Sequence, residues 1–485
     1  MSALMDLPAS GTAVRTPLLD LLRAGLGPAA FSCPGHKGGA GALPALREVI
    51  GDRALASDVW LDTTTYDELR RDLEQRIARL WSADRAFALV NGSTSGNHAL
   101  LLSTLAPGDE VVVARDAHLS THTALVLTGA SPVWVSPRVG EAGIGSGIHA
   151  EDFSAALARH PYAALAWVVS PSYAGVSSDL PELAEIARSR AVPFAVDEAW
   201  GPHLRFCRDL AVDAMAAGAD AAVTSTHKLL TSLSQSSVLV LREGVIDVGR
   251  TAHAVRMTQT TSPYLGLVAS IEACVAQLEE GGEALVRRAV DLARLARHML
   301  SRVPGVRVLG AREAEVPEER QDPCKIVLEI GDLGLDGPAA ETLLRARGVA
   351  PEGSDSHRLY LVVGPGDGVD SVRHLVLAVA GLRRGVGARP LRPVDPTLLA
   401  PPGPGDQLAT PREAYFAPSA AVALRDAVGR VAAELVTPYP PGVPVLAPGE
   451  RISGEAVDYL RGAVAAGVHI HGPDDPRAET VRVLA

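Results

Sequence analysis

The segment TSTHKLLTSLSQSS, residues 224–237, places Lys228 directly after His227 in a cluster of hydroxyl side chains. One apolar run lies just upstream of this segment and another lies just downstream. A lysine amine held at such a position can attack a carbonyl carbon and form a covalent link with it. Lys228 is therefore the first residue in this chain whose surroundings indicate chemistry.

A second hydroxyl-rich segment, NGSTSGNHALL at 91–101, follows a short apolar run and leads into a helical pattern. Backbone N–H groups and Ser or Thr hydroxyls at the start of a helix can bind an anion, phosphate in particular. Ser, Thr and Asn are also preferred residues for capping a helix. Taken alone, the segment is equally typical of an anion site and of an ordinary cap.

Asp197 ends the apolar run PFAVD, and His118 follows another apolar run, in RDAHLSTHT. Taken alone, Asp197 favours a helix cap over an acid that faces a ligand, and His118 favours a hydrogen-bonded turn histidine. The order along the chain changes this interpretation, because a hydroxyl cradle, a histidine, an acid and a lysine follow one another. A phosphorylated pyridine aldehyde requires these parts: phosphate donors, a flat group over its ring, a carboxylate for its ring nitrogen, and an amine.

The elements that position these residues alternate between short apolar runs and longer amphipathic segments over the first 300 residues. Helical patterns such as SGNHALLLSTLA and LPELAEIARSRA lie between the apolar runs. This alternation predicts a mostly parallel sheet covered by helices on both faces, with ligands at the carboxyl ends of the strands. The predicted strands are 86–90, 110–114, 132–135, 164–170, 193–197, 221–225 and 237–241.

The rest of the chain predicts two smaller units. A long helical pattern over about 266–302 leads to VRVLG, CKIVLEI, LYLVV and a helix near 368–384, which together indicate a smaller α/β domain. The Pro-rich stretch 388–408 is typical of an interdomain linker. The tail beyond it is expected to contain a helix over SAAVALRDAVGRVAAEL, 419–435, and the turn-rich TPYPPGVPVLAPGE.

Composition excludes several classes of protein. The chain has 485 residues, is 47% hydrophobic and carries a formal net charge of -11, without a Lys/Arg run, so we expect neither a nucleic-acid nor a membrane partner. No signal peptide or membrane span is read, and a cytoplasmic protein with a small-molecule partner is expected. The cysteines form no CxxC pair, which predicts reduced thiols and no metal site. They are Cys33, Cys207, Cys274 and Cys324.

These motifs resemble the pyridoxal-phosphate-dependent ornithine/lysine/arginine decarboxylases of the aspartate-aminotransferase fold. The resemblance covers most of the chain, and the combination of PGHKGG, STHKLL followed by SQSS, and PYPPGVPVLAPGE is specific. The matching segments are TPLLDLLRAG, FSCPGHKGG, NGSTSGN, RDAHLSTHTALVLTGA, VDEAWGPH, TSTHKLLTSLSQSS, TTSPYLGLVASIE and TPYPPGVPVLAPGE.

The resemblance implies an α/β protein of the pyridoxal-phosphate-dependent transferase fold type I. It implies a large domain with a mostly parallel sheet, a small α/β domain and a C-terminal α+β domain. The expected limits are an N-terminal segment at 1–60, the cofactor-binding large domain at 61–302, the small domain at 303–387, the linker at 388–408, and a C-terminal decarboxylase domain at 409–485.

Matched position by position, the resemblance implies that Lys228 is the Schiff-base lysine. Asp197 is implied as the partner of the pyridine nitrogen, and His118 as the imidazole stacked on the ring. Ala199 would pack beneath the ring, and Trp200 stands where some members have Trp and others His.

Further positions match phosphate-binding residues of the family: Ser93, Thr94, Ser225 and His227. Thr260 matches a residue that reaches the phosphate from the neighbouring subunit. This match implies a homodimer or a higher homo-oligomer with its active sites at the dimer interface.

The implied reaction is decarboxylation of a basic L-amino acid to the corresponding amine and CO2. Arginine is the first expectation because the chain resembles the short Gram-positive form, with lysine next and ornithine after. Since all three substrates end in a cation, an acidic group is expected near the pocket mouth. The candidates are Asp62, Asp67, Glu68 and Glu450, and Glu450 also matches a residue near the substrate entrance.

One departure from the family pattern and two alternative functions stay open. Leu119 follows His118 where the family usually has Lys. An aminotransferase or a lyase on the same fold remains an alternative, because the fold does not determine the reaction and Arg358 or Arg373 could hold a substrate carboxylate. A regulatory relative without catalysis is the second alternative, although such a protein would be expected to have lost the lysine or the acid.

Overall fold

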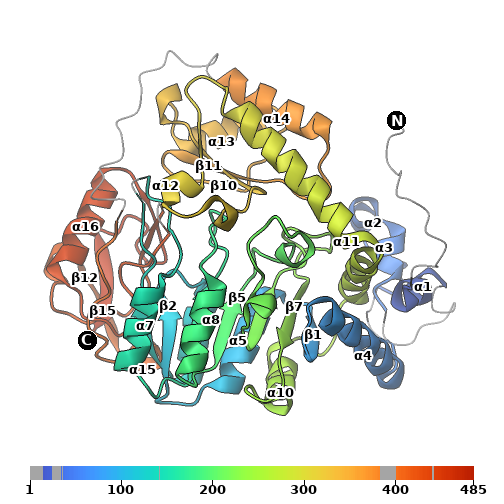
Figure 1. The fold of residues 1–485 in the computed structure, drawn as a ribbon, viewed down its shortest axis with the longest axis horizontal. Coiled ribbons are helices and arrows are strands. Elements are labelled where there is room, and N and C mark those ends of the chain that lie inside the picture. Colours follow the sequence, from blue (N-terminus) through green and yellow to red (C-terminus); the bar gives the residue numbers. More distant parts are fainter. Residues whose placement is uncertain are drawn as a thin grey trace.

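The computed structural model describes residues 15–24, 34, 36–59, 61–140, 142–382, 400–439 and 442–485. A seven-stranded sheet with helices on both faces occupies its centre (Figure 1). The strands lie in the order β1-β7-β6-β5-β4-β2-β3, and β7 runs antiparallel to both of its neighbours. They are β1 (Arg85–Leu89), β2 (Glu110–Ala114), β3 (Ser131–Val135), β4 (Leu165–Val169), β5 (Phe194–Asp197), β6 (Ala221–Thr224) and β7 (Ser237–Leu241).

All seven predicted strands are confirmed, and the mostly parallel sheet with them. Every residue of β5, β6 and β7 is buried, as expected of strands covered on both faces. Helices α5, α6 and α10 cover one face, and α4, α7, α8, α9 and α11 cover the other. Their bounds are α4 (Thr63–Leu80), α5 (Gly92–Thr104), α6 (Leu119–Thr128), α7 (Ala150–Arg159), α8 (Leu180–Ser189), α9 (Ala214–Ala217), α10 (Val248–Thr258) and α11 (Leu265–Leu300).

Helix α5 lies unusually close to the sheet because Gly96 faces it. A Cβ atom at this position would lie 2.6 Å from Cγ1 of Val223 and 2.8 Å from Cδ1 of Leu89. Such distances are shorter than a carbon–carbon contact allows, so only glycine fits. The close approach brings the N-terminus of α5 down to the carboxyl ends of β5 and β6.

Helix α11 runs from the large sheet to a second, four-stranded antiparallel sheet (Figure 1). The expected smaller α/β unit is therefore present, with the strand order β10-β11-β9-β8 and helices α13 and α14 packed together beside it. Its elements are β8 (Arg307–Leu309), α12 (Ala311–Ala314), β9 (Lys325–Glu329), α13 (Gly337–Arg345), β10 (Gly353–Ser354), β11 (Arg358–Val362) and α14 (Val369–Leu382).

The C-terminal unit corrects one prediction. The segment 419–435 is not a helix: it begins with β12 (Ser419–Ala423), which pairs antiparallel with β15 (Thr480–Leu484), and continues as a 3-10 turn and irregular backbone. The last residues of the chain provide a strand partner, and this tertiary pairing overrides the local helical propensity of an Ala-rich segment. The other elements are α15 (Pro411–Phe416), β13 (Thr437–Tyr439), α16 (Gly454–Ala465) and β14 (His469–His471).

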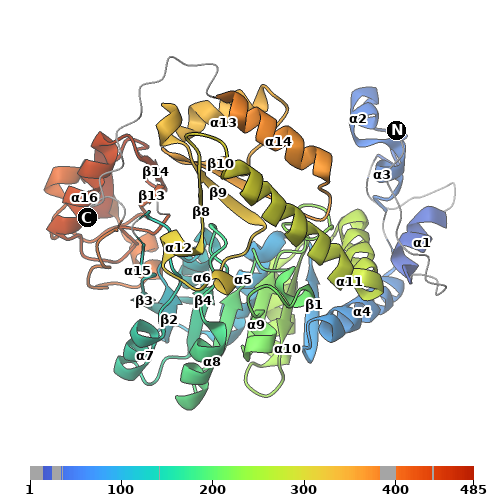
Figure 2. The same cartoon turned by 45° about the horizontal axis from the view of Figure 1, so that its top comes forward.

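Three short N-terminal helices lie at the opposite end of the molecule from this unit (Figure 2). They are α1 (Pro17–Ala24), α2 (Pro44–Ile50) and α3 (Asp52–Ala56). Cys33 and most of the predicted linker 388–408 lie outside the described residues. No helix within the described residues is both long enough and apolar enough to cross a membrane.

Candidate active site

The predicted site residues converge at the carboxyl edge of the large sheet. Asp197 ends β5, Ser225 follows β6, Ser93 lies in the first turn of α5 after β1, and His118 caps the N-terminus of α6 after β2. Since β5, β6 and the other parallel strands point the same way, their ends meet at one edge.

The first turn of α5 and the loop after β6 form a polar cradle. Ser93 Oγ lies 2.6 Å from Ser225 Oγ, and both side chains are buried. Asn91 at the N-cap makes no side-chain cap hydrogen bond, so the ordinary capping role considered for this segment is not filled. Uncapped N–H groups beside two hydroxyls are the donor set that a phosphate group requires.

His227 and Thr94 flank this cradle. Nδ1 of His227 lies 2.7 Å from the Ser236 carbonyl oxygen, which fixes the ring and leaves Nε2 for another partner. Burial lowers the pKa of His227, so this imidazole is neutral at neutral pH. Thr94 is exposed in the single chain.

A buried hydrogen-bond network connects the acid to the imidazole. Nδ2 of Asn97 donates to Oδ2 of Asp197 at 2.7 Å and to Oγ of Ser120 at 2.9 Å. The Ser120 hydroxyl lies 2.8 Å from Nδ1 of His118, and the backbone N–H of Ala199 donates to Oδ1 of Asp197 at 3.1 Å. Both oxygens of the Asp197 carboxylate thus accept a hydrogen bond, and this side chain is 2% exposed.

The same contacts set the proton position on His118. The backbone N–H of Ser120 donates to Nδ1 of His118 at 3.2 Å, so Nδ1 is the acceptor and the neutral ring carries its proton on Nε2. Burial lowers the pKa of His118, and the field of Lys228 lowers it further against the opposing field of Asp197. The ring is thus neutral, and Ser120 holds it at Nδ1.

Lys228 lies on the loop after β6 with Nζ 4.1 Å from the centre of the Trp200 ring. Burial lowers the pKa of this amine, while the carboxylates of Asp197 and Glu352 oppose the shift. A lowered pKa increases the unprotonated fraction that can attack a carbonyl carbon. The side chain of Ala199, two residues after Asp197 in the sequence, is buried.

Two predicted residues lie elsewhere in the single chain. Thr260 is exposed beyond α10, and its hydroxyl accepts from the Ser262 backbone N–H at 3.2 Å. Glu450 is 1% exposed and forms an ion pair with Arg115, which follows β2. Glu450 therefore links the C-terminal unit to the large sheet and does not lie open at a pocket mouth. Leu119, beside His118, is 61% exposed.

The other acidic candidates lie on α4. Asp62 caps this helix by accepting from the Thr65 N–H at 3.0 Å, and Asp67 and Glu68 are exposed on its first turns. Besides Asp197, the acid whose field reaches Lys228 is Glu352, an exposed residue of the smaller α/β unit. Sequence reasoning missed Glu352 because it has no motif of its own.

The two arginines that would suit an aminotransferase are engaged elsewhere. Arg358 is 2% exposed, and its guanidinium donates to the carbonyl oxygens of Ala142 and Gly143. Arg373 is exposed on α14 and pairs with Asp370 at 3.3 Å. Neither guanidinium is directed to Lys228 by these contacts.

A parallel sheet that ends in a buried acid, a lysine loop and a phosphate cradle defines the fold-type-I class of pyridoxal-phosphate enzymes. The family model for the Orn/Lys/Arg decarboxylase major domain matches residues 16–370, and the model for the C-terminal domain matches residues 406–473. The chain belongs to the Orn/Lys/Arg decarboxylase family.

Relatives with known names span nearly the whole chain. It is 34% identical over 470 residues to an arginine decarboxylase of Bacillus subtilis (strain 168), covering 94% of this chain and 95% of the relative. It is 24% identical to the constitutive lysine decarboxylase of Escherichia coli (strain K12), covering 94% and 79%. The crystal structure of the Francisella novicida lysine decarboxylase LdcF superposes with a TM-score of 0.83 at 21% identity, covering 98% and 82%, which shows the shared fold.

Proposed function

We propose that this protein decarboxylates a basic L-amino acid with pyridoxal 5'-phosphate, with arginine as the first substrate to test, then lysine, then ornithine. The observation that carries the proposal is the meeting of Asp197, His118 and Lys228 at the sheet edge. Hydrogen bonds through Asn97 and Ser120 join the acid to the imidazole, and the charge of Asp197 acts on the Lys228 amine. Arginine comes first because the chain is 34% identical to an arginine decarboxylase. We also propose that the reaction takes place in the cytoplasm and that its amine product serves polyamine biosynthesis.

The residues at the edge of the sheet fit the cofactor. Ser93, Ser225 and Nε2 of His227 supply donors for its phosphate, together with the uncapped N–H groups of α5. Asp197 would hold the protonated pyridine nitrogen, and Lys228 would hold the aldehyde carbon. When bound, pyridoxal phosphate supplies an electron sink for the electron pair that remains when CO2 leaves.

The chain's own residues then have defined tasks. Asn97 and the backbone N–H of Ala199 donate to the two oxygens of Asp197 and fix the carboxylate that would hold the ring nitrogen. The Nε2 proton of His118 and the ammonium form of Lys228 are the two candidates for returning a proton to the substrate carbon.

The proposed assembly is a homodimer or a larger homo-oligomer with its sites at the subunit interface. Thr260 supports this because it matches a phosphate-binding position yet lies exposed in the single chain, where a second copy could use it. Thr94, next to Ser93 of the cradle, and Leu119, next to His118, are also exposed, and a second copy could cover them.

Purified protein should be assayed with arginine, lysine and ornithine for CO2, amine and keto-acid products. Release of CO2 with equal amounts of amine supports decarboxylation, whereas keto-acid formation would replace the proposal with an aminotransferase. The Lys228→Ala variant should lose turnover and the absorbance of the covalently linked cofactor. An unchanged spectrum in that variant would show that another residue binds the aldehyde.

A further inference from the structure

Lys325 is the first residue of β9, and it is 1% exposed. Its Nζ atom has no hydrogen-bond partner among the described residues. An isolated buried ammonium is strongly unfavourable, and proteins normally pair such a group or keep it for function. The amine therefore requires an explanation that the fold alone does not supply.

This amine lies beside the lysine of the candidate active site. Nζ of Lys325 is 3.4 Å from the centre of the Trp200 ring and 4.5 Å from the centre of the Tyr173 ring. Nζ of Lys228 is 4.1 Å from the centre of the same Trp200 ring. The two Nζ atoms therefore lie no farther apart than the sum of their distances to the centre of the Trp200 ring.

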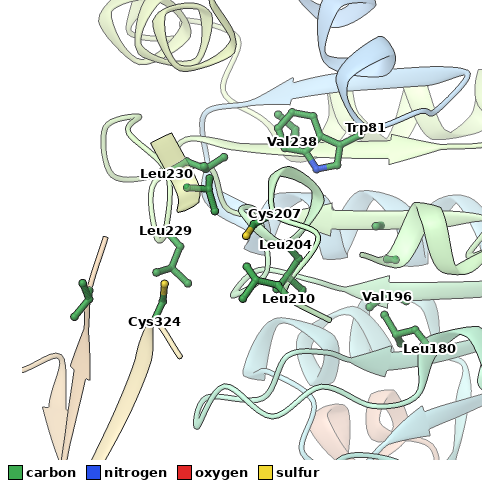
Figure 3. Close-up of a cluster of buried hydrophobic side chains, with 14 of the residues drawn as sticks. Trp81, Leu180, Val196, Leu204, Cys207, Leu210, Leu229, Leu230, Val238 and Cys324 are labelled. Carbon is green, nitrogen blue, oxygen red and sulfur yellow. The ribbon is translucent and has the colours of Figure 1, made fainter. Parts of the chain in front are cut away.

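The packing that brings them together is visible in the core between the two sheets (Figure 3). Cys324 points from the small-domain strand toward Leu229, so the residues next to the two lysines lie in one buried cluster. Gly175 has φ +84°, and a Cβ atom there would lie 2.5 Å from Cβ of Lys325. The stem of Lys325 is therefore confined by backbone and cannot swing out to solvent on that side.

The nearby acids do not neutralise this amine by direct contact. Asp322 pairs with Nε2 of His203 at 3.1 Å and accepts from the Cys324 N–H at 2.8 Å. Glu352 is exposed and acts on Lys325 only through its field. Burial lowers the pKa of Lys325 to about 7, with the fields of Glu352 and Asp322 opposing and that of Lys228 adding to the shift.

The composition of the chain indicates that the lysine itself matters. The sequence has 45 lysine and arginine residues, and only three of these are lysines: Lys37, Lys228 and Lys325. Two of the three converge on one tryptophan. The chain uses arginine for nearly all of its cations, but at this point it has lysine, the side chain whose charge adjusts to its surroundings.

We propose that Lys325 binds the α-carboxylate of the amino-acid substrate. The proposal rests on the proposed function, in which the substrate amine takes the place of Lys228. In an α-amino acid the amine and the carboxylate share one carbon, so the carboxylate is carried into the neighbourhood of the second amine. Arg358, which could otherwise do this, is held by the carbonyl oxygens of Ala142 and Gly143.

The test compares ligands with and without the carboxylate. For the cofactor-loaded wild type, Lys325→Met and Lys325→Arg, KM is measured for the preferred amino acid and the inhibition constant for its decarboxylated amine. Hydrogen bonds between charged groups predict that Lys325→Met raises KM about 10- to 100-fold. The inhibition constant of the amine should change less than about threefold, because the amine has no carboxylate for Lys325 to bind. Lys325→Arg retains the charge, so its KM should lie between that of the wild type and that of Lys325→Met.

Equal weakening of the amino acid and the amine in Lys325→Met would overturn the proposal, as would unchanged binding of both. If Lys325→Met does not fold or load the cofactor, Lys325→Gln is measured in the same way. Release of CO2 by the wild type tests the proposed function separately. If the wild type binds amino acids without releasing CO2, dissociation constants read from the absorbance of the bound cofactor give the same comparison for Lys325.

Discussion

The buried ion pair between Arg115 and Glu450 offers a test of how the C-terminal unit is attached and of what Glu450 does. Both side chains are 1% exposed, and Nη2 of Arg115 donates to Oε2 of Glu450 at 2.7 Å, with a second contact between Nη1 and Oε1. Nε of Arg115 also donates to the Pro444 carbonyl oxygen at 2.9 Å. The Ala447 N–H donates to Oε2 of Glu450 at 3.1 Å.

The size of the effect depends on what each substitution leaves behind. Breaking a buried pair by removing one partner costs about 3–5 kcal/mol. Glu450→Gln belongs at the lower end, about 3 kcal/mol, because Arg115 keeps the Pro444 carbonyl as an acceptor. Arg115→Met belongs at the upper end, about 5 kcal/mol, since the Ala447 N–H is then the main remaining donor to the carboxylate. The double variant Arg115→Met with Glu450→Leu leaves no unpaired charge, so its free energy of unfolding should be close to that of the wild type.

Hydrogen exchange measured by mass spectrometry reads this loss locally, in peptides from residues 409–485. A loss of about 3 kcal/mol in Glu450→Gln corresponds to about 100-fold faster exchange there, with peptides of the large sheet unchanged. KM for the preferred amino acid should stay within about twofold, because Glu450 is buried away from solvent. Unchanged exchange together with a raised KM would refute this reasoning and restore Glu450 to the substrate entrance.

Three further predictions concern the site and its support. In steady-state assays, Asp197→Ala should lower kcat on the order of 100- to 1000-fold, because it removes the acid proposed to hold the ring nitrogen. Ser93→Ala should lower kcat much less. Similar losses in the two variants would show that the acid was wrongly chosen. The folded-state pKa of Lys325, about 7, lies below its ordinary value of 10.5, so its charge opposes folding fully below pH 7 and progressively less up to pH 10.5. Lys325→Met should therefore raise the thermal midpoint more at pH 6 than at pH 10, by up to about 5 kcal/mol in the free energy of unfolding, and equal shifts at both pH values would contradict this. Gly96→Ala should destabilise the protein by about 1–3 kcal/mol in urea unfolding, because its Cβ would lie 2.6 Å from Val223, and a neutral result would show that α5 can shift.

The sequence predicted the large sheet well because its signal is local. Each strand is a short apolar run, and β2 (Glu110–Ala114) and β7 (Ser237–Leu241) begin and end where the apolar runs do. Such runs must be buried wherever they lie, so the local pattern predicts them as strands, whereas the order of the strands in the sheet follows from the fold. The prediction of a helix at 419–435 was wrong for the opposite reason, because the structure of this segment depends on pairing with residues 480–484 at the far end of the chain.

The residues of the candidate site that stand in motifs could be predicted from the sequence. Those that reach the site only through tertiary packing could not. Lys228 and Asp197 stand in recognisable segments at strand ends, and the structure brings them together. Asn97 lies within a motif, yet its bond to Asp197 spans 100 residues and cannot be read from spacing. Lys325 and Glu352 come from the small unit, and their positions near Lys228 follow from how the two sheets pack.

The division of labour between arginine and lysine in this chain bears on which reaction the site performs. Arg115 and Arg358 are buried and tied to carbonyl or carboxylate oxygens of other segments, so both join parts of the fold. A guanidinium keeps its charge under all ordinary conditions and would hold a substrate carboxylate throughout a reaction. An amine with a pKa of about 7 can pair with a carboxylate when it arrives and lose its charge after the carboxylate has gone. On the proposal that Lys325 receives the carboxylate, its chemistry therefore suits a reaction that removes this group better than one that retains it.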